Sequence, residues 1–139
     1  MNVRLTVAAL GTVILLFGLV GVLRPELVLG ALGFVVVDTS HTAFIVGEIR
    51  ATYGGVFTAM GVVVLWAVVD PYRYRDRILV VGLLWLGACV ARLFGTSVDG
   101  SPGLLGWASA MFEGIVGVLL SLASRLARSE VVTPVGPGA

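Results

Sequence analysis

The amino-acid sequence predicts an all-α integral membrane protein, a four-transmembrane-helix bundle with a short interfacial helix after the first span. Of its 139 residues, 58% are hydrophobic and 12% are charged, and the mean hydropathy is +1.07. A soluble domain of this length could not bury so much apolar surface. The sequence also contains four separate apolar runs, each close to the roughly 20 residues that a helix needs to span a bilayer.

Segments that a membrane-spanning helix does not tolerate separate the four runs. Pro25, in the sequence RPE, ends the first run, because proline lacks the N–H group that a continuing helix needs. The charged segment DPYRYRDR follows the second run, and the turn-forming segment GTSVDGSPG follows the third. The predicted spans are 5–23, 43–69, 78–95 and 104–122.

Two further segments lie outside these spans. Segment 26–41 is too long and too apolar for a plain loop, so we expect a short interfacial helix across the outer end of the bundle. A re-entrant segment or an extension of the first helix would also suit its composition. Segment 129–139 carries Pro134 and Pro137, which predict a disordered cytoplasmic tail. Residues 1–128 are then expected to form one membrane domain.

The arginines predict the orientation of the chain in the membrane. With four spans, both termini and the loop between the second and third spans lie on one side of the bilayer. Most arginines belong to that side, whereas Arg24 lies in the opposite loops. The positive-inside rule therefore places both termini in the cytoplasm. The arginines on the cytoplasmic side are Arg4, Arg73, Arg75, Arg77, Arg125 and Arg128.

Four charged residues fall inside the spans, and each needs a partner there. An unpaired charge at the centre of a bilayer costs at least roughly 2.5–3.5 kcal/mol. Glu48 and Arg50 project about 160° apart on an α-helix, so they do not pair with each other. We expect Glu113 to pair with Arg50 or Arg92, and Glu48 to pair with the other arginine. Tyr53, one turn beyond Arg50, would donate a hydrogen bond into this polar cluster in the outer half of the bundle.

Glycines in the second span predict close packing against another helix. Gly47, Gly54 and Gly61 recur every seven residues, and Gly55 lies beside them. Small residues at such spacing allow two helix backbones to approach each other. Access for a ligand is the alternative interpretation of the same glycines.

Several kinds of chemistry have no support in the sequence. His41 is the one histidine and Cys89 the one cysteine, so we expect no metal site, no haem and no disulfide. The net charge of +1 does not suggest nucleic acid as a partner. No nucleophile–base arrangement or nucleotide-binding motif is present, so no cofactor and no catalytic residue are assigned, and we expect that the protein is not an enzyme.

The segment GEIRATYGG resembles the ExRxxYGG motif of a family of small four-helix bacterial membrane proteins of unknown function. That family is more distantly similar to DoxX-like four-helix membrane proteins. The resemblance implies the fold and a location in the bacterial cytoplasmic membrane, and it implies no reaction. The matching residues are Glu48, Arg50, Tyr53, Gly54, Gly55, Arg92, the loop Asp99-Gly100-Ser101-Pro102, and Glu113.

Three functional hypotheses remain open. The first is an accessory or structural membrane protein in which the polar cluster specifies helix packing. The second is the binding of an anionic lipid or small amphipathic ligand, with Arg50 and Arg92 holding its polar group. The third is proton-coupled transport or membrane-embedded acid/base catalysis by Glu113. The expected partners are the lipid bilayer and either further copies of the chain or a larger membrane complex.

Overall fold

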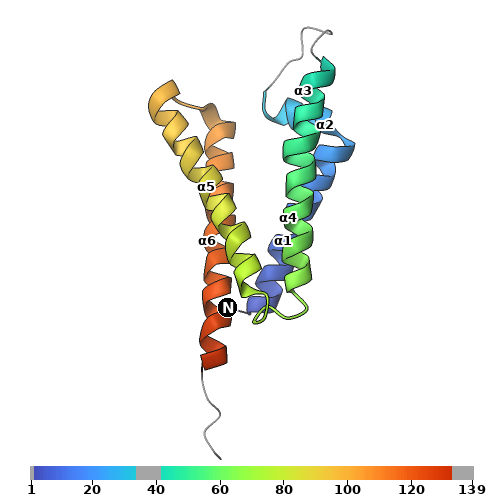
Figure 1. Cartoon of the computed structure of the whole chain (residues 1–139). Coiled ribbons are helices and arrows are strands. Elements are labelled where there is room, and N and C mark those ends of the chain that lie inside the picture. Colours follow the sequence, from blue (N-terminus) through green and yellow to red (C-terminus); the bar gives the residue numbers. More distant parts are fainter. Residues whose placement is uncertain (1, 34–41, 133–139) are drawn as a thin grey trace, which may run out of the picture.

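The computed structural model describes residues 2–33 and 42–132, and this part of the chain is helical (Figure 1). One of its long helical stretches, residues 42–67, consists of an α-helix, a π-helix and a second α-helix that follow one another without a break. The elements are α1 (Val3–Leu23), α2 (Pro25–Ala31), α3 (Thr42–Ile49), η1 (Arg50–Val56), α4 (Phe57–Ala67), α5 (Arg75–Asp99) and α6 (Gly103–Val132).

Four stretches of helix in the described residues are long and apolar enough to cross a membrane, which confirms the predicted all-helical class and four helices of membrane-spanning length. Each of them overlaps one of the runs expected from the sequence. They are Val3–Leu23, Ala43–Ala67, Arg75–Asp99 and Gly103–Ala127.

The last two helices are longer than the apolar runs that predicted them. Helix α5 begins at Arg75 and ends at Asp99, directly before Gly100, whose φ of 94° is a conformation that favours glycine and ends a helix. Helix α6 continues to Val132, so residues 129–132 are helical where the sequence predicted the start of a disordered tail. The rest of that predicted tail, 133–139, lies outside the described residues.

A short helix follows the first span, within the segment where one was expected. Proline disfavours helical backbone at the residue before it, and Arg24 has φ −135° and ψ 57°, so α1 ends at Leu23. Pro25 then occupies the first position of α2, where its missing N–H costs nothing. The remainder of the predicted segment, 34–41, lies outside the described residues. The location of α2 at a membrane interface stays a prediction.

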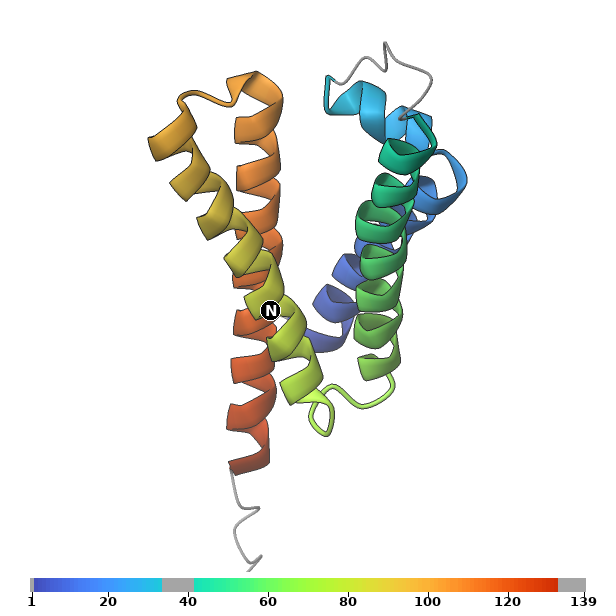
Figure 2. The ribbon, with the colours of Figure 1, turned by 45° about the horizontal axis from the view of Figure 1, so that its top comes forward.

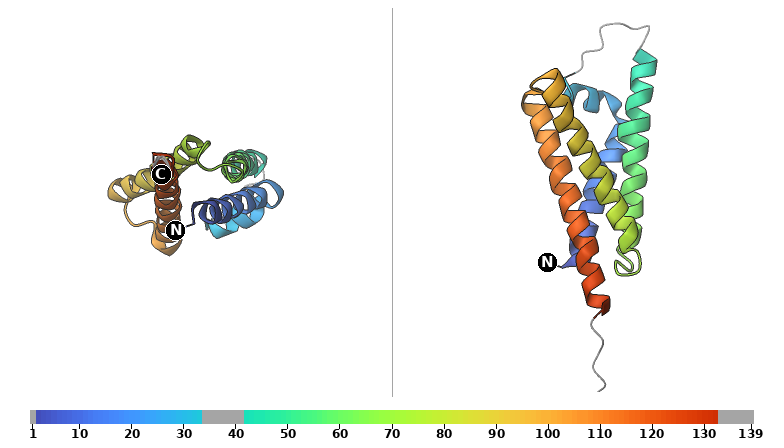
Figure 3. Two further views of the ribbon diagram at one scale, coloured as in Figure 1. Left: turned by 90° about the horizontal axis from the view of Figure 1, so that it is seen from below. Right: turned by 60° about the vertical axis from the view of Figure 1, so that its left-hand side comes forward.

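The long helices form two hairpins that diverge from a common base. Helix α1 packs along η1 and α4 in the first hairpin, and α5 packs along α6 in the second. The hairpins meet near the N-terminus and the 68–74 turn, and they separate toward the end that carries α2 (Figures 1 and 2). Viewed from below, each hairpin appears as its own pair of helices (Figure 3). The hydrophobic core is therefore concentrated toward the base, where Val7, Val64, Ile78 and Leu120 are fully buried.

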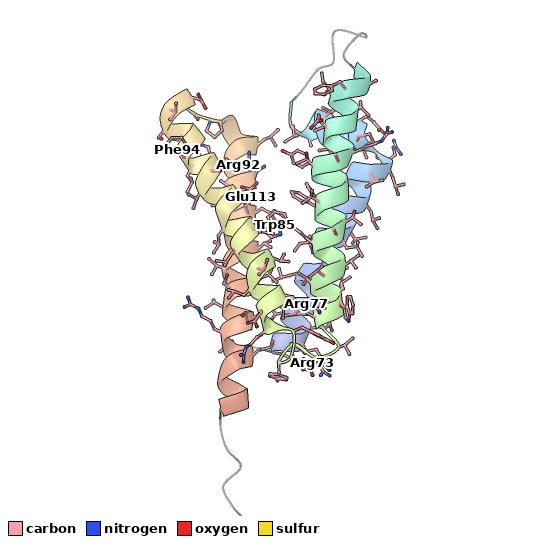
Figure 4. The ribbon with its side chains drawn as sticks, viewed as in Figure 1. Arg73, Arg77, Trp85, Arg92, Phe94 and Glu113 are labelled. Carbon is pink, nitrogen blue, oxygen red and sulfur yellow. The ribbon has the colours of Figure 1, made fainter. Side chains whose placement is uncertain are left out.

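Arginines and aromatic rings surround the base of the molecule. The guanidinium of Arg77 lies 4.5 Å from the ring centre of Tyr74 and 4.9 Å from that of Trp66 (Figure 4). Arg4 donates a hydrogen bond to the backbone oxygen of Val69, with an N–O distance of 3.5 Å. These contacts join the N-terminus, the end of α4 and the start of α5 at the closed end of the molecule.

Two of the glycines predicted to pack do lie against α1. A Cβ atom on Gly61 would lie 2.5 Å from the backbone nitrogen of Leu15, and one on Gly54 would lie 2.7 Å from the backbone nitrogen of Val22. Such distances exclude any side chain and require direct contact between the two backbones.

The other two glycines are not against another helix among the described residues. Nothing lies within 4 Å of a Cβ placed on Gly47, and a Cβ on Gly55 would approach just a carbonyl oxygen of its own turn. The prediction assumed 100° of rotation per residue throughout the second span. The π-helix η1 has i→i+5 hydrogen bonds and turns less per residue, so Gly47 is out of phase with Gly54.

Candidate ligand-binding cleft

An ion pair between α5 and α6 is the central polar feature of the structure. Arg92 donates from Nε to Oε2 of Glu113 at 3.1 Å and from Nη2 to Oε1 at 2.6 Å. Two parallel hydrogen bonds of this kind are the strong, orienting form of an arginine–carboxylate pair. The Glu113 side chain is 8% exposed and that of Arg92 is 29% exposed. Of the two partners expected for Glu113, the structure brings Arg92 to it.

Glycines allow α5 and α6 to approach closely enough for this pair to form. A Cβ atom on Gly117 would lie 2.9 Å from the backbone nitrogen of Leu86, and one on Gly82 would lie 3.1 Å from the backbone oxygen of Gly117. Gly114, directly after Glu113, faces the sulfur of Cys89 at a Cβ distance of 3.4 Å. The ion pair therefore lies above a backbone contact between its two helices, which holds both side chains in place.

Arg50 binds a different part of the molecule. Its Nε donates to the backbone oxygen of Val22, at 3.3 Å, near the C-terminal end of α1. The last carbonyl groups of a helix lack partners within the helix and carry partial negative charge. Arg50 is therefore a cap for α1, which explains why it does not join Glu113.

Glu48 also differs from its predicted role. It is exposed on α3, and the described residues provide no ion pair or hydrogen bond for its side chain. The expected pairing of Glu48 with the second arginine is therefore absent from this part of the chain. The reason is that Arg50 is occupied at α1, while residues two apart on a helix point in different directions.

The acidic side chain that interacts with the charge of Arg50 is Glu26, at the start of α2, and not Glu48. Arg24 forms an ion pair with Glu26. The side-chain hydrogen bond from Arg24 lowers the pKa of Glu26, with a small further lowering from the charge of Arg50. The sequence placed Arg24 in an outer loop and assigned Glu26 no role; an acid in the first turn of a helix after proline was the available signal.

This pair predicts a small dependence of stability on pH. Because the folded state lowers the pKa of Glu26 below its ordinary value of 4.5, the carboxylate stabilises the fold above that pH and loses this effect as the pH falls through the folded pKa. The effect is small because the pair is exposed. We expect the stability difference between wild type and Glu26→Gln, measured by unfolding in sodium dodecyl sulfate, to shrink on acidification. A difference that does not change with pH would contradict this assignment.

A cavity of about 510 Å³ lies between the diverging hairpins, with the ion pair in its wall. Residues of α1, α2, η1 and α4 line one side, and residues of α5 and α6 line the other. Figure 4 shows Trp85, Glu113 and Arg92 at successive heights along the second hairpin, from the base upward. Apart from Arg92, Glu113, Tyr53 and Ser109, the lining consists of apolar side chains, including that of Trp85.

Five aromatic side chains, which we call the aromatic floor, join the two hairpins in this cavity. The ring centres of Phe57 and Trp85 are 4.9 Å apart, and those of Trp85 and Phe112 are 5.5 Å apart. Sequence reasoning singled out Tyr53 alone among them, because aromatic residues within apolar spans carry no separate signal. The aromatic floor consists of Phe17, Tyr53, Phe57, Trp85 and Phe112.

The composition of the cavity is typical of a ligand-binding site. Ligand sites are mostly apolar hollows with a few polar groups that orient the ligand, and this cavity has that composition. Tyr53 lies near enough to Arg92 to interact with its charge. Within residues 2–33 and 42–132, no three His, Cys, Asp or Glu side chains gather as a metal site would require.

In its described residues the protein is all-helical, with four helices of membrane-spanning length and a partly buried ion pair in an apolar cleft. A family model described as "Domain of unknown function (DUF4345)" matches residues 3–124, and the chain belongs to this family. No curated protein and no solved structure matches the chain. The expected membership of a family of unknown function is thus confirmed, while the ExRxxYGG motif as its signature and the similarity to DoxX-like proteins stay predictions.

Proposed function

We propose that this protein binds a small, mainly apolar molecule with one polar group in the cleft between its hairpins. The observation that carries the proposal is the cavity of about 510 Å³ with the Arg92–Glu113 pair in its wall. Its volume falls within the range of roughly 300–1,000 Å³ that is usual for ligand sites. The aromatic floor would contact the apolar body of the ligand, and the ion pair would orient its polar group.

The arginines support an orientation in which the cleft opens toward the outer leaflet. Arg4, Arg73 and Arg77 all lie at the base of the molecule, opposite the open end. Under the positive-inside rule this base is cytoplasmic, as are both termini. We place the protein in the bacterial cytoplasmic membrane on the resemblance described above. A ligand would then reach the cleft from the outer half of the bilayer.

Filling the cleft tests the proposal directly. Ala108 lines the cavity, whereas Ala88 is exposed on α5 outside it. On protein released from mild detergent, we expect native mass spectrometry to detect bound apolar molecules on the wild type and to detect none on Ala108→Phe. Ala88→Phe adds the same side chain to a lipid-facing surface and is expected to retain them. Equal occupancy in the wild type and both variants would overturn the proposal.

An accessory or structural role is the second candidate, and one observation favours it. The ion pair joins neighbouring helices above a glycine contact, so it would specify their packing even without a ligand. A structural role does not by itself explain an open apolar cavity beside the pair. In an accessory role the protein would associate with copies of itself or with a larger membrane complex, and both associations stay predictions.

Acid/base chemistry at Glu113 has less support. Both of its carboxylate oxygens accept hydrogen bonds from Arg92. Proton transport needs a series of polar groups across the membrane, and a single ion pair does not form one. We therefore do not propose the third hypothesis.

A further inference from the structure

We infer that the polar group of the ligand is an uncharged hydrogen-bond acceptor, such as an ester or ketone carbonyl, and that it binds beside Arg92. This inference rests on the proposed function and specifies the chemistry of its ligand. It differs from the anionic lipid that the second of the three sequence-based hypotheses named first. The charge of the cavity wall and its unpaired hydrogen-bonding groups support it independently.

The cavity wall has no excess positive charge. Among the cavity-lining residues, Arg92 and Glu113 are the charged ones, and they neutralise each other through two hydrogen bonds. Arg50, the second cation expected there, binds the carbonyl of Val22 instead and does not line the cavity. An anion at Arg92 would also lie close to the carboxylate of Glu113, and like charges repel strongly where water is scarce. A neutral polar group avoids this repulsion.

Arg92 leaves hydrogen-bond donors without partners in this wall. The carboxylate of Glu113 is engaged on both oxygens, and the hydroxyl of Ser109 donates to the backbone oxygen of Leu105 at 3.0 Å. A guanidinium has five N–H groups, and Arg92 directs two hydrogen bonds to Glu113, so further donors remain.

A ligand that brings an acceptor to Arg92 would pair with one of its remaining N–H groups, whereas a purely apolar ligand would leave these groups unpaired. Buried donors without partners are costly, and the loss of one hydrogen bond to a ligand weakens binding. The net value of one such bond corresponds to a change in affinity of roughly two- to tenfold. This is the difference that we expect between an acceptor-bearing ligand and its purely apolar counterpart.

Trp85 is placed to report on the occupant. It precedes Arg92 by seven residues on α5, so the two lie about 10 Å apart along the helix axis. A ligand whose acceptor binds Arg92 would extend its apolar chain across the aromatic floor. A bromine atom at the far end of that chain would then quench the fluorescence of Trp85.

The test uses a variant in which Trp85 is the remaining tryptophan, made by Trp66→Phe and Trp107→Phe, reconstituted in neutral phosphatidylcholine vesicles. Both replaced side chains are exposed and lie outside the cavity. Three probes of equal chain length are compared: a terminally brominated alkane, the matching methyl ester, and the free fatty acid at a pH where it is ionised. We expect saturable quenching, with the ester bound two- to tenfold more tightly than the alkane and the ionised acid bound more weakly than the ester.

A Glu113→Gln variant provides the sharper comparison. Glutamine keeps the shape of the side chain and one acceptor for Arg92, but it leaves the arginine charge unneutralised. We expect the preference to reverse, so that this variant binds the ionised acid more tightly than the ester. If this variant does not fold, the comparison of the three probes on the Trp85 reporter protein still tests the inferred acceptor.

The outcomes separate the inference from the proposed function. Saturable quenching that is equal for all three probes, or strongest for the ionised acid on the Trp85 reporter protein, would confirm a cleft that binds apolar molecules and would overturn the inferred acceptor. No saturable quenching by any probe would overturn the proposed function together with the inference.

Discussion

Replacing Arg92 by methionine is expected to lower the free energy of unfolding by about 3 kcal/mol. The substitution leaves the Glu113 carboxylate, on a residue 6% exposed, without the two hydrogen bonds that it accepts from Arg92. Methionine roughly preserves the unbranched shape of the lost side chain, so most of the loss comes from the unpaired acid. Unfolding in mixed micelles with increasing sodium dodecyl sulfate measures it.

Two controls separate the ion pair from other effects of removing an arginine. The double variant Arg92→Met with Glu113→Met replaces the pair by apolar side chains, and we expect it to recover most of the lost stability, because no charge is left buried. Arg125→Met removes an exposed arginine near the end of α6 and is expected to have little effect. If Arg92→Met and Arg125→Met are equally stable, the pair contributes nothing to folding.

Placing a side chain on Gly18 is expected to be at least as damaging. A Cβ atom there would lie 2.3 Å from the backbone nitrogen of Thr58 and 2.7 Å from its Oγ1, and real Cβ atoms do not approach other atoms so closely. The first hairpin would have to open, because the obstacle is backbone that cannot rotate away. We expect Gly18→Leu to reduce the free energy of unfolding by about 3 kcal/mol or more, measured by the same denaturation.

Gly87→Ala is a control for replacing a helical glycine that has no close neighbour. Gly87 is also in a long helix, and nothing described lies within 4 Å of a Cβ built on it. Alanine is the better helix former, so this variant is expected to be neutral or slightly stabilised, by at most about 1 kcal/mol. Normal folding of Gly18→Leu would show that α1 and α4 are not packed backbone to backbone.

The π-helix overlaps the GEIRATYGG segment that carries the family resemblance. Segment GEIRATYGG ends within η1, which contains Arg50, Tyr53 and Gly54. Short π-helical segments occur often at functional sites, where the altered rotation redirects side chains. Here Tyr53 lines the cavity while Arg50 caps α1 and Gly54 contacts α1, so one short segment serves both the cleft and the packing beneath it.

The glycine pattern shows how far sequence reasoning reaches in such a chain. Gly54 and Gly61, spaced by seven residues, were predicted to contact another helix, and they do contact α1. Gly11 and Gly18, also seven residues apart in the first span, show the same spacing, and they pack against α4. They were not part of the sequence-based prediction. Gly47 was predicted to contact another helix and does not contact one among the described residues, because the π-helix changes the rotation between it and Gly54.

The sequence by itself determined the helical class, the four membrane-length helices and the candidates for buried charge. These follow from local properties, since the length of an apolar run and the position of a proline act within one helix. Tertiary structure decided that Arg92 rather than Arg50 meets Glu113, and that the hairpins diverge around a cavity with an aromatic floor. Which faces of two helices meet depends on relative rotation and depth, and apolar residues on every face of a membrane helix leave both unspecified.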